Sequence, residues 1–151
     1  MTHDDSNGLT PLDPTDEQLL VDRAVSLFRQ GYNCSQAVCL SFASRYQIAE
    51  PLMARIAASF GGGIGRMRET CGAACGMFLL AGLEVTDADD SATPIGTDNS
   101  PYPSQQVKKR NYEVVQHLAA QFAGRTGSLL CRELLANSAK PTATAATPEQ
   151  R

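Results

Sequence analysis

The chain has 151 residues, of which 42% are apolar, and a formal net charge of −3 at pH 7. This length and apolar content suffice for one domain with a single core. The acidic balance argues against a nucleic-acid-binding protein, which usually carries a basic patch. Five cysteines, an odd number, do not suggest a framework of structural disulfides. They leave core thiols, a redox pair or metal ligands as the alternatives.

The start of the chain, Met-Thr-His-Asp-Asp, has neither the basic segment nor the apolar stretch of a signal peptide. The longest nearly continuous apolar stretch, residues 73–83, is too short to span a bilayer. We therefore expect a soluble cytoplasmic protein that binds neither membrane nor nucleic acid. Residues 1–12 and 138–151 are expected to be disordered, because they lack a core-forming pattern. Residues 13–137 then form a single helical domain.

The first two predicted helices have clear start and stop signals. Pro14 suits the first turn of a helix, and Gly31 suits the position just after its end. A second helix is predicted to start at Asn33, a good N-cap with Gln36 three residues on, and to turn Val38, Phe42 and Tyr46 inward. The inward face of the first helix is predicted from apolar residues at helical spacing, namely Leu19, Leu20, Ala24, Leu27 and Phe28.

The middle of the chain combines two helices with a glycine-rich run. A short third helix is predicted after Pro51. The glycine-rich run at residues 61–65 ends it, and a fourth helix is predicted from about Thr70 to Gly82. This helix is rich in Ala and Gly, so a neighbouring helix could pack closely against it. Residues 84–103 form a long acidic loop, and loops of that length are usually functional or disordered.

Two more helices complete the predicted fold. A fifth is expected from about Ser104 to Ala123, ending at Gly124, and Ser128 could cap a last short helix. No segment alternates convincingly as a strand, and the chain has no repeat. The sequence therefore predicts an all-α fold, a small bundle of about five to six helices with a glycine-rich loop before the central helix.

Cys71 and Cys75 stand four residues apart at the start of the predicted fourth helix, so they share one helix face. This spacing suits two ligands of one metal or cluster better than a relaxed disulfide. The helix N-terminus, Arg66 and Arg68 would favour the thiolate of Cys71, and Glu69 would partly offset them. Cys75 is equally consistent with a small buried core residue.

The other cysteines lie far away in sequence. Cys34 directly follows the predicted cap of the second helix, so it also lies in a first turn. Cys39 is expected to pack in the core, and the spacing alone assigns no role to Cys131. His3 and His117 are not expected to be ligands. A metal site would therefore rest mainly on thiolates, which suit zinc or an Fe–S cluster.

The glycine-rich run fits neither the P-loop pattern nor the dinucleotide fingerprint, which requires a preceding strand. Its glycines would let the backbone turn tightly and approach another helix or a ligand. Anion binding through its amides and Arg66 also stays open. The candidate cofactor-contacting residues are Gly62, Gly63, Arg66 and Gly72.

Four segments together are similar to a known family: G-Y-N-C-S-Q-A-V at 31–38, F-G-G-G-I-G-R at 60–66, C-G-A-A-C-G at 71–76 and G-S-L-L-C-R-E-L-L at 127–135. In order and separation they resemble the C_GCAxxG_C_C family, small prokaryotic redox-active proteins named for their cysteines and a C-G-A-x-x-G motif. The resemblance covers about residues 17–137. It implies a helical domain whose distant cysteines form a redox-active or prosthetic-group site, with an Fe–S cluster as one suggestion.

The resemblance carries over Cys34, Cys71 and Cys131 as site thiols, with Gly72, Ala73 and Gly76 as packing positions. The family usually has a further cysteine beyond the position of Cys131, and this chain has none there. Either Cys75 supplies the missing thiol or the site has three.

We therefore expect Cys34, Cys71 and Cys131, with or without Cys75, to converge on one site. They would act as a dithiol/disulfide site or as ligands of an Fe–S cluster or zinc. In the dithiol version Cys71 attacks, and Cys34 or Cys131 resolves the intermediate. One alternative is a non-catalytic helical binding or scaffolding module with inert buried cysteines, and another is a small-molecule or anion binder at the glycine-rich loop. The sequence does not identify the redox partner or decide between a monomer and a homo-oligomer.

Overall fold

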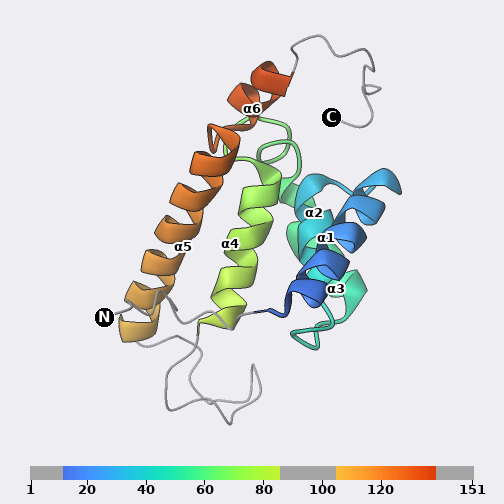
Figure 1. Cartoon of the computed structure of the whole chain (residues 1–151), viewed down its shortest axis with the longest axis vertical. Coiled ribbons are helices and arrows are strands. Elements are labelled where there is room, and N and C mark those ends of the chain that lie inside the picture. The colour runs from blue at the N-terminus through green and yellow to red at the C-terminus, as the bar shows by residue number, and fades with distance from the viewer. Residues whose placement is uncertain (1–11, 86–104, 139–151) are drawn as a thin grey trace.

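The computed structural model describes residues 12–85 and 105–138. Within these ranges the chain forms six α-helices and one short 3-10 helix, with no strand, which confirms the predicted all-α class (Figure 1). The helices are α1 (Pro14–Arg29), α2 (Cys34–Phe42), α3 (Glu50–Ala57), η1 (Ala58–Phe60), α4 (Gly72–Glu84), α5 (Gln105–Thr126) and α6 (Cys131–Ser138). None of them combines the length and the apolar content that crossing a membrane requires.

Three predicted segments lie wholly or almost wholly outside the described residues: the N-terminal segment, the acidic loop and the C-terminal tail. The predicted domain limits therefore stay predictions.

Helix α4 occupies the middle of the molecule, with α5 along one side and α1, α2 and α3 on the other (Figure 1). Helices α2 and α4 meet through small buried side chains, among them Ala37, Cys39 and Ala74. The Cys39 thiol donates a hydrogen bond to the carbonyl of Gly76, with 3.5 Å between sulfur and oxygen. Small residues allow the two helices to approach closely, as the Ala- and Gly-rich sequence of α4 predicts.

The apolar core consists of two clusters, one on each side of α4. The first joins α2, α3 and α4 through Cys39, Leu40, Ala43, Met53, Ala57 and Leu80. The second joins α4 to α5 through Ala81, Val85 and Val114. Cys39 has no exposed surface, so its predicted place in the core is confirmed.

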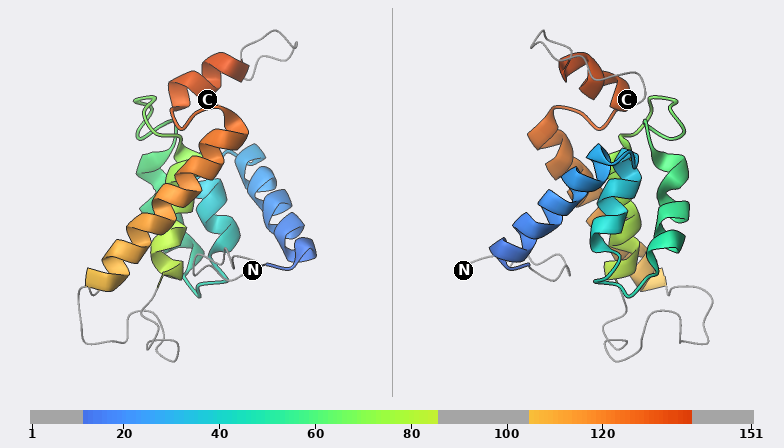
Figure 2. Two further views of the ribbon diagram at one scale, coloured as in Figure 1. Left: turned by 60° about the vertical axis from the view of Figure 1, so that its left-hand side comes forward. Right: turned by 90° about the vertical axis from the view of Figure 1, so that its right-hand side faces the viewer.

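Helix α1 differs from its predicted packing. It contains no fully buried residue, and Leu19 and Phe28 are 61% and 44% exposed. Only a narrow strip, which includes Leu27, packs against the core. The reason is position: α1 lies at the outer edge of the bundle (Figure 2), so neighbouring helices cover less of it than its apolar spacing suggests.

The helix ends show which local signals determine the structure. Asn33 and Gln36 form the predicted capping box at the start of α2, with reciprocal bonds of 2.9 and 3.1 Å. Helix α2 ends at Phe42, and α5 continues past Gly124, its predicted end, to Thr126. A helix interior tolerates a glycine at a cost of about 1 kcal/mol, and α5 stops only before Gly127, where φ is 94°.

Candidate functional site

Three cysteines from distant parts of the sequence stand at the starts of three helices. Cys34 is the first residue of α2, Cys71 is the N-cap of α4, and Cys131 is the first residue of α6. All three line one cavity of about 440 Å³ at the end of the bundle where these helices begin. The structure therefore brings together the three thiols that the family resemblance selects.

Cys34 reaches α4 because residue 72 is a glycine. A Cβ atom added to Gly72 would lie 2.4 Å from Cys34 Sγ and 2.6 Å from the carbonyl oxygen of Phe60. Real Cβ atoms do not approach other atoms this closely, so only glycine fits. The Cys34 thiol thus lies against the backbone of the first turn of α4, directly beside Cys71.

Cys131 is joined to the start of α4 through the backbone. The amide of Cys71 donates to the carbonyl of Leu129, and the amide of Cys131 donates to the carbonyl of Glu69, each at 2.7 Å. These two bonds flank an isolated antiparallel bridge between Thr70 and Leu130. Helix α6 is therefore attached to the segment that precedes α4.

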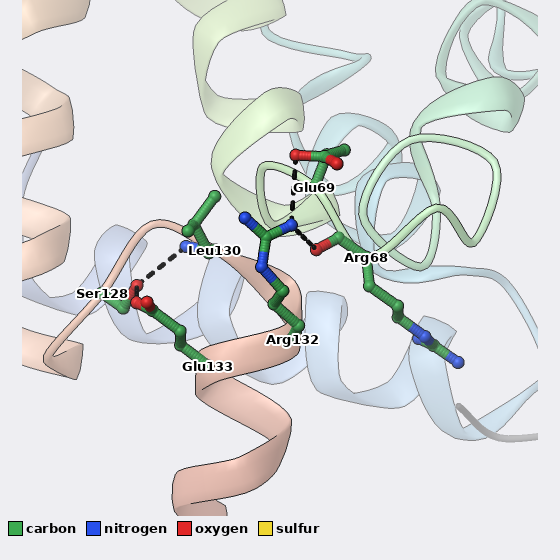
Figure 3. A network of polar contacts seen from close by, with 6 residues as sticks. All are labelled: Arg68, Glu69, Ser128, Leu130, Arg132 and Glu133. Atoms are coloured by element: carbon green, nitrogen blue, oxygen red, sulfur yellow. Dashed lines mark hydrogen bonds and ion pairs between the residues drawn. The ribbon is translucent and has the colours of Figure 1, made fainter.

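Polar side chains reinforce this attachment (Figure 3). Arg132 Nη1 lies 3.3 Å from Glu69 Oε2 and donates a 3.4 Å hydrogen bond to the Arg68 carbonyl oxygen. The Ser128 hydroxyl accepts from the Leu130 amide at 3.0 Å and also contacts the Glu133 carboxylate. Ser128 thus orders the turn before α6, where the sequence suggests a cap.

The glycine-rich run forms a tight coil with left-handed backbone. Its glycines are not the only residues with positive φ, because Ile64, Arg66 and Arg68 have φ of 60°, 61° and 60°. Each such non-glycine residue costs about 1–2 kcal/mol, and strain of this kind clusters at functional sites. The coil packs against α6, where a Cβ on Gly63 would lie 2.6 Å from Cys131 Cβ.

The electrostatics of Cys71 differ from the prediction. Burial raises its pKa above the usual thiol value, hydrogen bonds from the amides of Ala74 and Ala73 lower it, and charge on Cys34 or Cys131 raises it further. The helix N-terminus therefore acts as expected, but burial outweighs it.

The thiol that Arg68 contacts is that of Cys131, whereas the sequence led us to expect the arginine beside Cys71. Arg68 Nη1 donates a hydrogen bond to Cys131 Sγ at 3.7 Å. Figure 3 shows the Arg68 side chain extending away from the Arg132–Glu69 ion pair. The expectation of an arginine-supported thiolate at Cys71 is therefore replaced by a fixed positive charge beside Cys131.

Cys75 stands apart from the other three. It is buried, does not line the cavity, and its thiol donates a 3.8 Å hydrogen bond to the Thr70 carbonyl. Burial raises its pKa, and charge on Cys71 and Cys34 adds to this effect. Of the two predicted roles, the position fits a buried residue better than a site thiol.

Within residues 12–85 and 105–138, no three Cys, His, Asp or Glu side chains are arranged to hold one metal ion. Thiolates are suitable donors for zinc or an Fe–S cluster. However, the predicted ligands Cys34, Cys71, Cys75 and Cys131 would have to move to share one ion. His117 lies on the exposed side of α5, and His3 is outside the described residues.

The four candidate cofactor-contacting residues divide into two pairs. Gly62 and Arg66 line the cavity, whereas Gly63 and Gly72 are buried against Cys131 and Cys34. The sequence analysis missed the contribution of α1, whose last turn adds Phe28 and Arg29 to the lining. The one available signal was proximity, because α1 ends only a few residues before Cys34.

Comparison with known proteins gives one match. Residues 32–151 match the family described as "Putative redox-active protein (C_GCAxxG_C_C)". No curated protein and no solved structure matches the chain. The matched region contains all five cysteines and the glycine-rich run.

Proposed function

Since the chain belongs to the C_GCAxxG_C_C family, we propose that it is a thiol–disulfide redox protein that uses Cys34, Cys71 and Cys131 at one shared site. The observation that carries the proposal is the convergence of these three helix-start cysteines on a single cavity. A scaffold with inert thiols would not need three separate helix starts to meet at one accessible space.

The surroundings of the thiols suggest a role for each. Cys131 is the attacking thiol, because Arg68 Nη1 donates a hydrogen bond to its sulfur and orients that sulfur at the cavity. Cys71 is the resolving thiol, because it lines the same cavity as the other two cysteines and is held to the Cys131 segment by backbone bonds. This reverses the order expected from the sequence, in which Cys71 attacks.

The reaction transfers two electrons from the protein to a disulfide substrate. The Cys131 thiolate attacks one substrate sulfur, the substrate S–S bond breaks, and the first half leaves as a thiolate that takes a proton from water. Cys71 loses its proton and attacks Cys131 Sγ, which releases the second half. The products are two substrate thiols and a Cys71–Cys131 disulfide, and an external dithiol would reduce that disulfide to complete the cycle.

Disulfide mapping tests these roles. The reduced protein is treated with a small excess of hydroxyethyl disulfide, alkylated and analysed by peptide mass spectrometry. We expect a Cys71–Cys131 disulfide in the wild type. In Cys71→Ala, a mixed disulfide should accumulate on Cys131. Cys75→Ala and Cys39→Ala are controls, and both should form the wild-type disulfide at a similar rate.

Two other outcomes would point to the competing functions. Five thiols that stay unpaired in the folded protein would contradict the redox proposal and favour the scaffolding module. Stoichiometric iron or zinc after anaerobic purification, with a visible spectrum lost in Cys71→Ala, would favour the metal-ligand alternative. In that alternative the same cysteines would hold the metal or cluster, which would supply the electron-transfer chemistry.

A further inference from the structure

The cavity that holds the three thiols is positively charged on one side. Arg29 from α1 and Arg66 and Arg68 from the glycine-rich coil all line it, and no Asp or Glu among the described residues does. The ion pairs in the described part of the chain engage other arginines: Arg23, Arg45 and Arg132. Arg29 and Arg66 therefore keep their charge available to whatever enters, while Arg68 donates its hydrogen bond to Cys131.

The helix starts add to this charge. Helices α2, α4 and α6 all begin at the cavity, and the first turn of a helix carries a partial positive charge from its aligned amides. The carboxylates two residues from Cys71 and from Cys131, Glu69 and Glu133, lie outside the lining. Glu69 is paired with Arg132, and Glu133 contacts the Ser128 hydroxyl. Positive charge thus reaches the thiols from the loop and from the backbone.

Apolar side chains line another part of the cavity. Phe28 contributes from the last turn of α1, Tyr32 from the α1–α2 connection, and Leu134 and Leu135 from α6. Phe28, Tyr32 and Leu135 are 44%, 39% and 37% exposed, so they form an accessible rim. A volume of about 440 Å³ falls in the range of small-molecule sites.

We propose that the substrate is a low-molecular-weight organic disulfide that carries carboxylate groups. This inference rests on the proposed thiol–disulfide function and adds the substrate class to it. The apolar rim contacts the carbon chains, the arginines bind the carboxylates, and the central S–S bond lies next to the thiols. The reaction is the two-electron exchange described above, and its products are two carboxylate-bearing thiols.

The test compares three disulfides of similar size that differ in charge. Dithiodipropionate is a dianion, hydroxyethyl disulfide is neutral and cystamine is a dication. Second-order rates of oxidation of the reduced full chain are measured, and each is divided by the rate of the same disulfide with N-acetylcysteinamide. This division removes the intrinsic reactivity of each probe. We expect the normalised rate of the dianion to exceed that of the neutral probe by about tenfold, and cystamine to be slowest.

Variants and salt identify the source of the preference. Arg29→Gln and Arg66→Gln should each reduce the preference for the dianion about threefold, and so should a high salt concentration, because salt screens accessible charges. Arg55→Gln is the matched control: Arg55 is an exposed arginine on α3 outside the cavity, and this substitution should leave the preference unchanged. Salt dependence is measured on the wild type, so it does not depend on any variant folding.

Failure of this inference can be separated from failure of the proposed function. Equal normalised rates for the three probes, with the expected disulfide formed, would overturn the substrate class and leave the redox function standing. If no probe produces a disulfide in the folded protein, both are overturned. A preference for the dianion that stays at its wild-type value in both arginine variants would show that the cavity arginines do not recognise the substrate.

Discussion

Gly72 is the residue at which a single methyl group should disturb the thiol site most directly. In Gly72→Ala the new Cβ would lie 2.4 Å from Cys34 Sγ, 2.6 Å from the Phe60 carbonyl oxygen and 3.2 Å from Gly61 Cα. The Cys34 side chain can rotate, but the other two atoms belong to the backbone of a tightly coiled segment. The clash therefore has to be relieved by moving α4 away from that segment.

The expected cost follows from two opposing effects. Overpacking of a well-packed site costs about 1–3 kcal/mol, and replacing glycine by alanine within a helix gains up to about 1 kcal/mol. We therefore expect Gly72→Ala to lower the free energy of unfolding by about 1–2 kcal/mol. In a domain of this size each kcal/mol shifts the melting temperature by about 2–4 °C.

Gly82 provides a matched control in the same helix. It is exposed, and a Cβ added there meets nothing within 4 Å. Gly82→Ala should therefore raise the free energy of unfolding by about 0.5–1 kcal/mol. Urea unfolding of both variants in the presence of a reductant measures the difference. If Gly72→Ala is as stable as Gly82→Ala, the close approach of α4 to Cys34 is wrong.

Two further predictions concern the core. Burial raises the pKa of Cys39 from 9.0 to about 11, so the thiol ionises at a lower pH in the unfolded chain than in the folded one. Its contribution to stability is therefore intact below pH 9. Between pH 9 and pH 11 the free energy of unfolding falls by on the order of 2 kcal/mol. Urea titrations at several pH values measure this fall, and Cys39→Ala should make it shallower; an equally steep fall in that variant would assign it to other groups. Tyr46→Phe removes a 2.6 Å hydrogen bond to Glu84 Oε2 and should lower the free energy of unfolding by about 1–2 kcal/mol without changing disulfide formation. An unchanged melting temperature would show that this bond contributes nothing to stability.

The features predicted correctly from sequence are those that depend on local chemistry. The Asn33–Gln36 capping box is formed by residues three apart, and it positions Cys34 in a first turn regardless of the rest of the fold. The Ala- and Gly-rich face of α4 likewise predicts close packing, because small side chains let the backbones of two helices approach each other. Helix class and approximate limits follow from the same short-range patterns.

The features that were missed depend on tertiary contacts. Nothing near Cys131 indicates that its amide pairs with the carbonyl of Glu69, because that bond joins residues far apart in the chain. The orientation of the Arg68 side chain depends on the left-handed backbone conformation of the coil. No sequence pattern indicates that an arginine adopts this conformation. The exposed face of α1 reflects its place at the edge of the bundle, which apolar spacing alone does not determine.

If Cys71 and Cys131 form the proposed disulfide, the backbone bonds between Cys71 and Leu129 and between Cys131 and Glu69 would link the redox state of the protein to its stability. These bonds hold the Cys71 and Cys131 segments together in the reduced protein, so the proposed disulfide could form without bringing distant parts of the chain together. In the unfolded chain the same disulfide would close a loop of about 60 residues, a restriction of about 4 kcal/mol on the loop-entropy model. The oxidised protein would therefore resist unfolding more strongly, and oxidation by substrate would also protect the protein until a reductant restores the thiols.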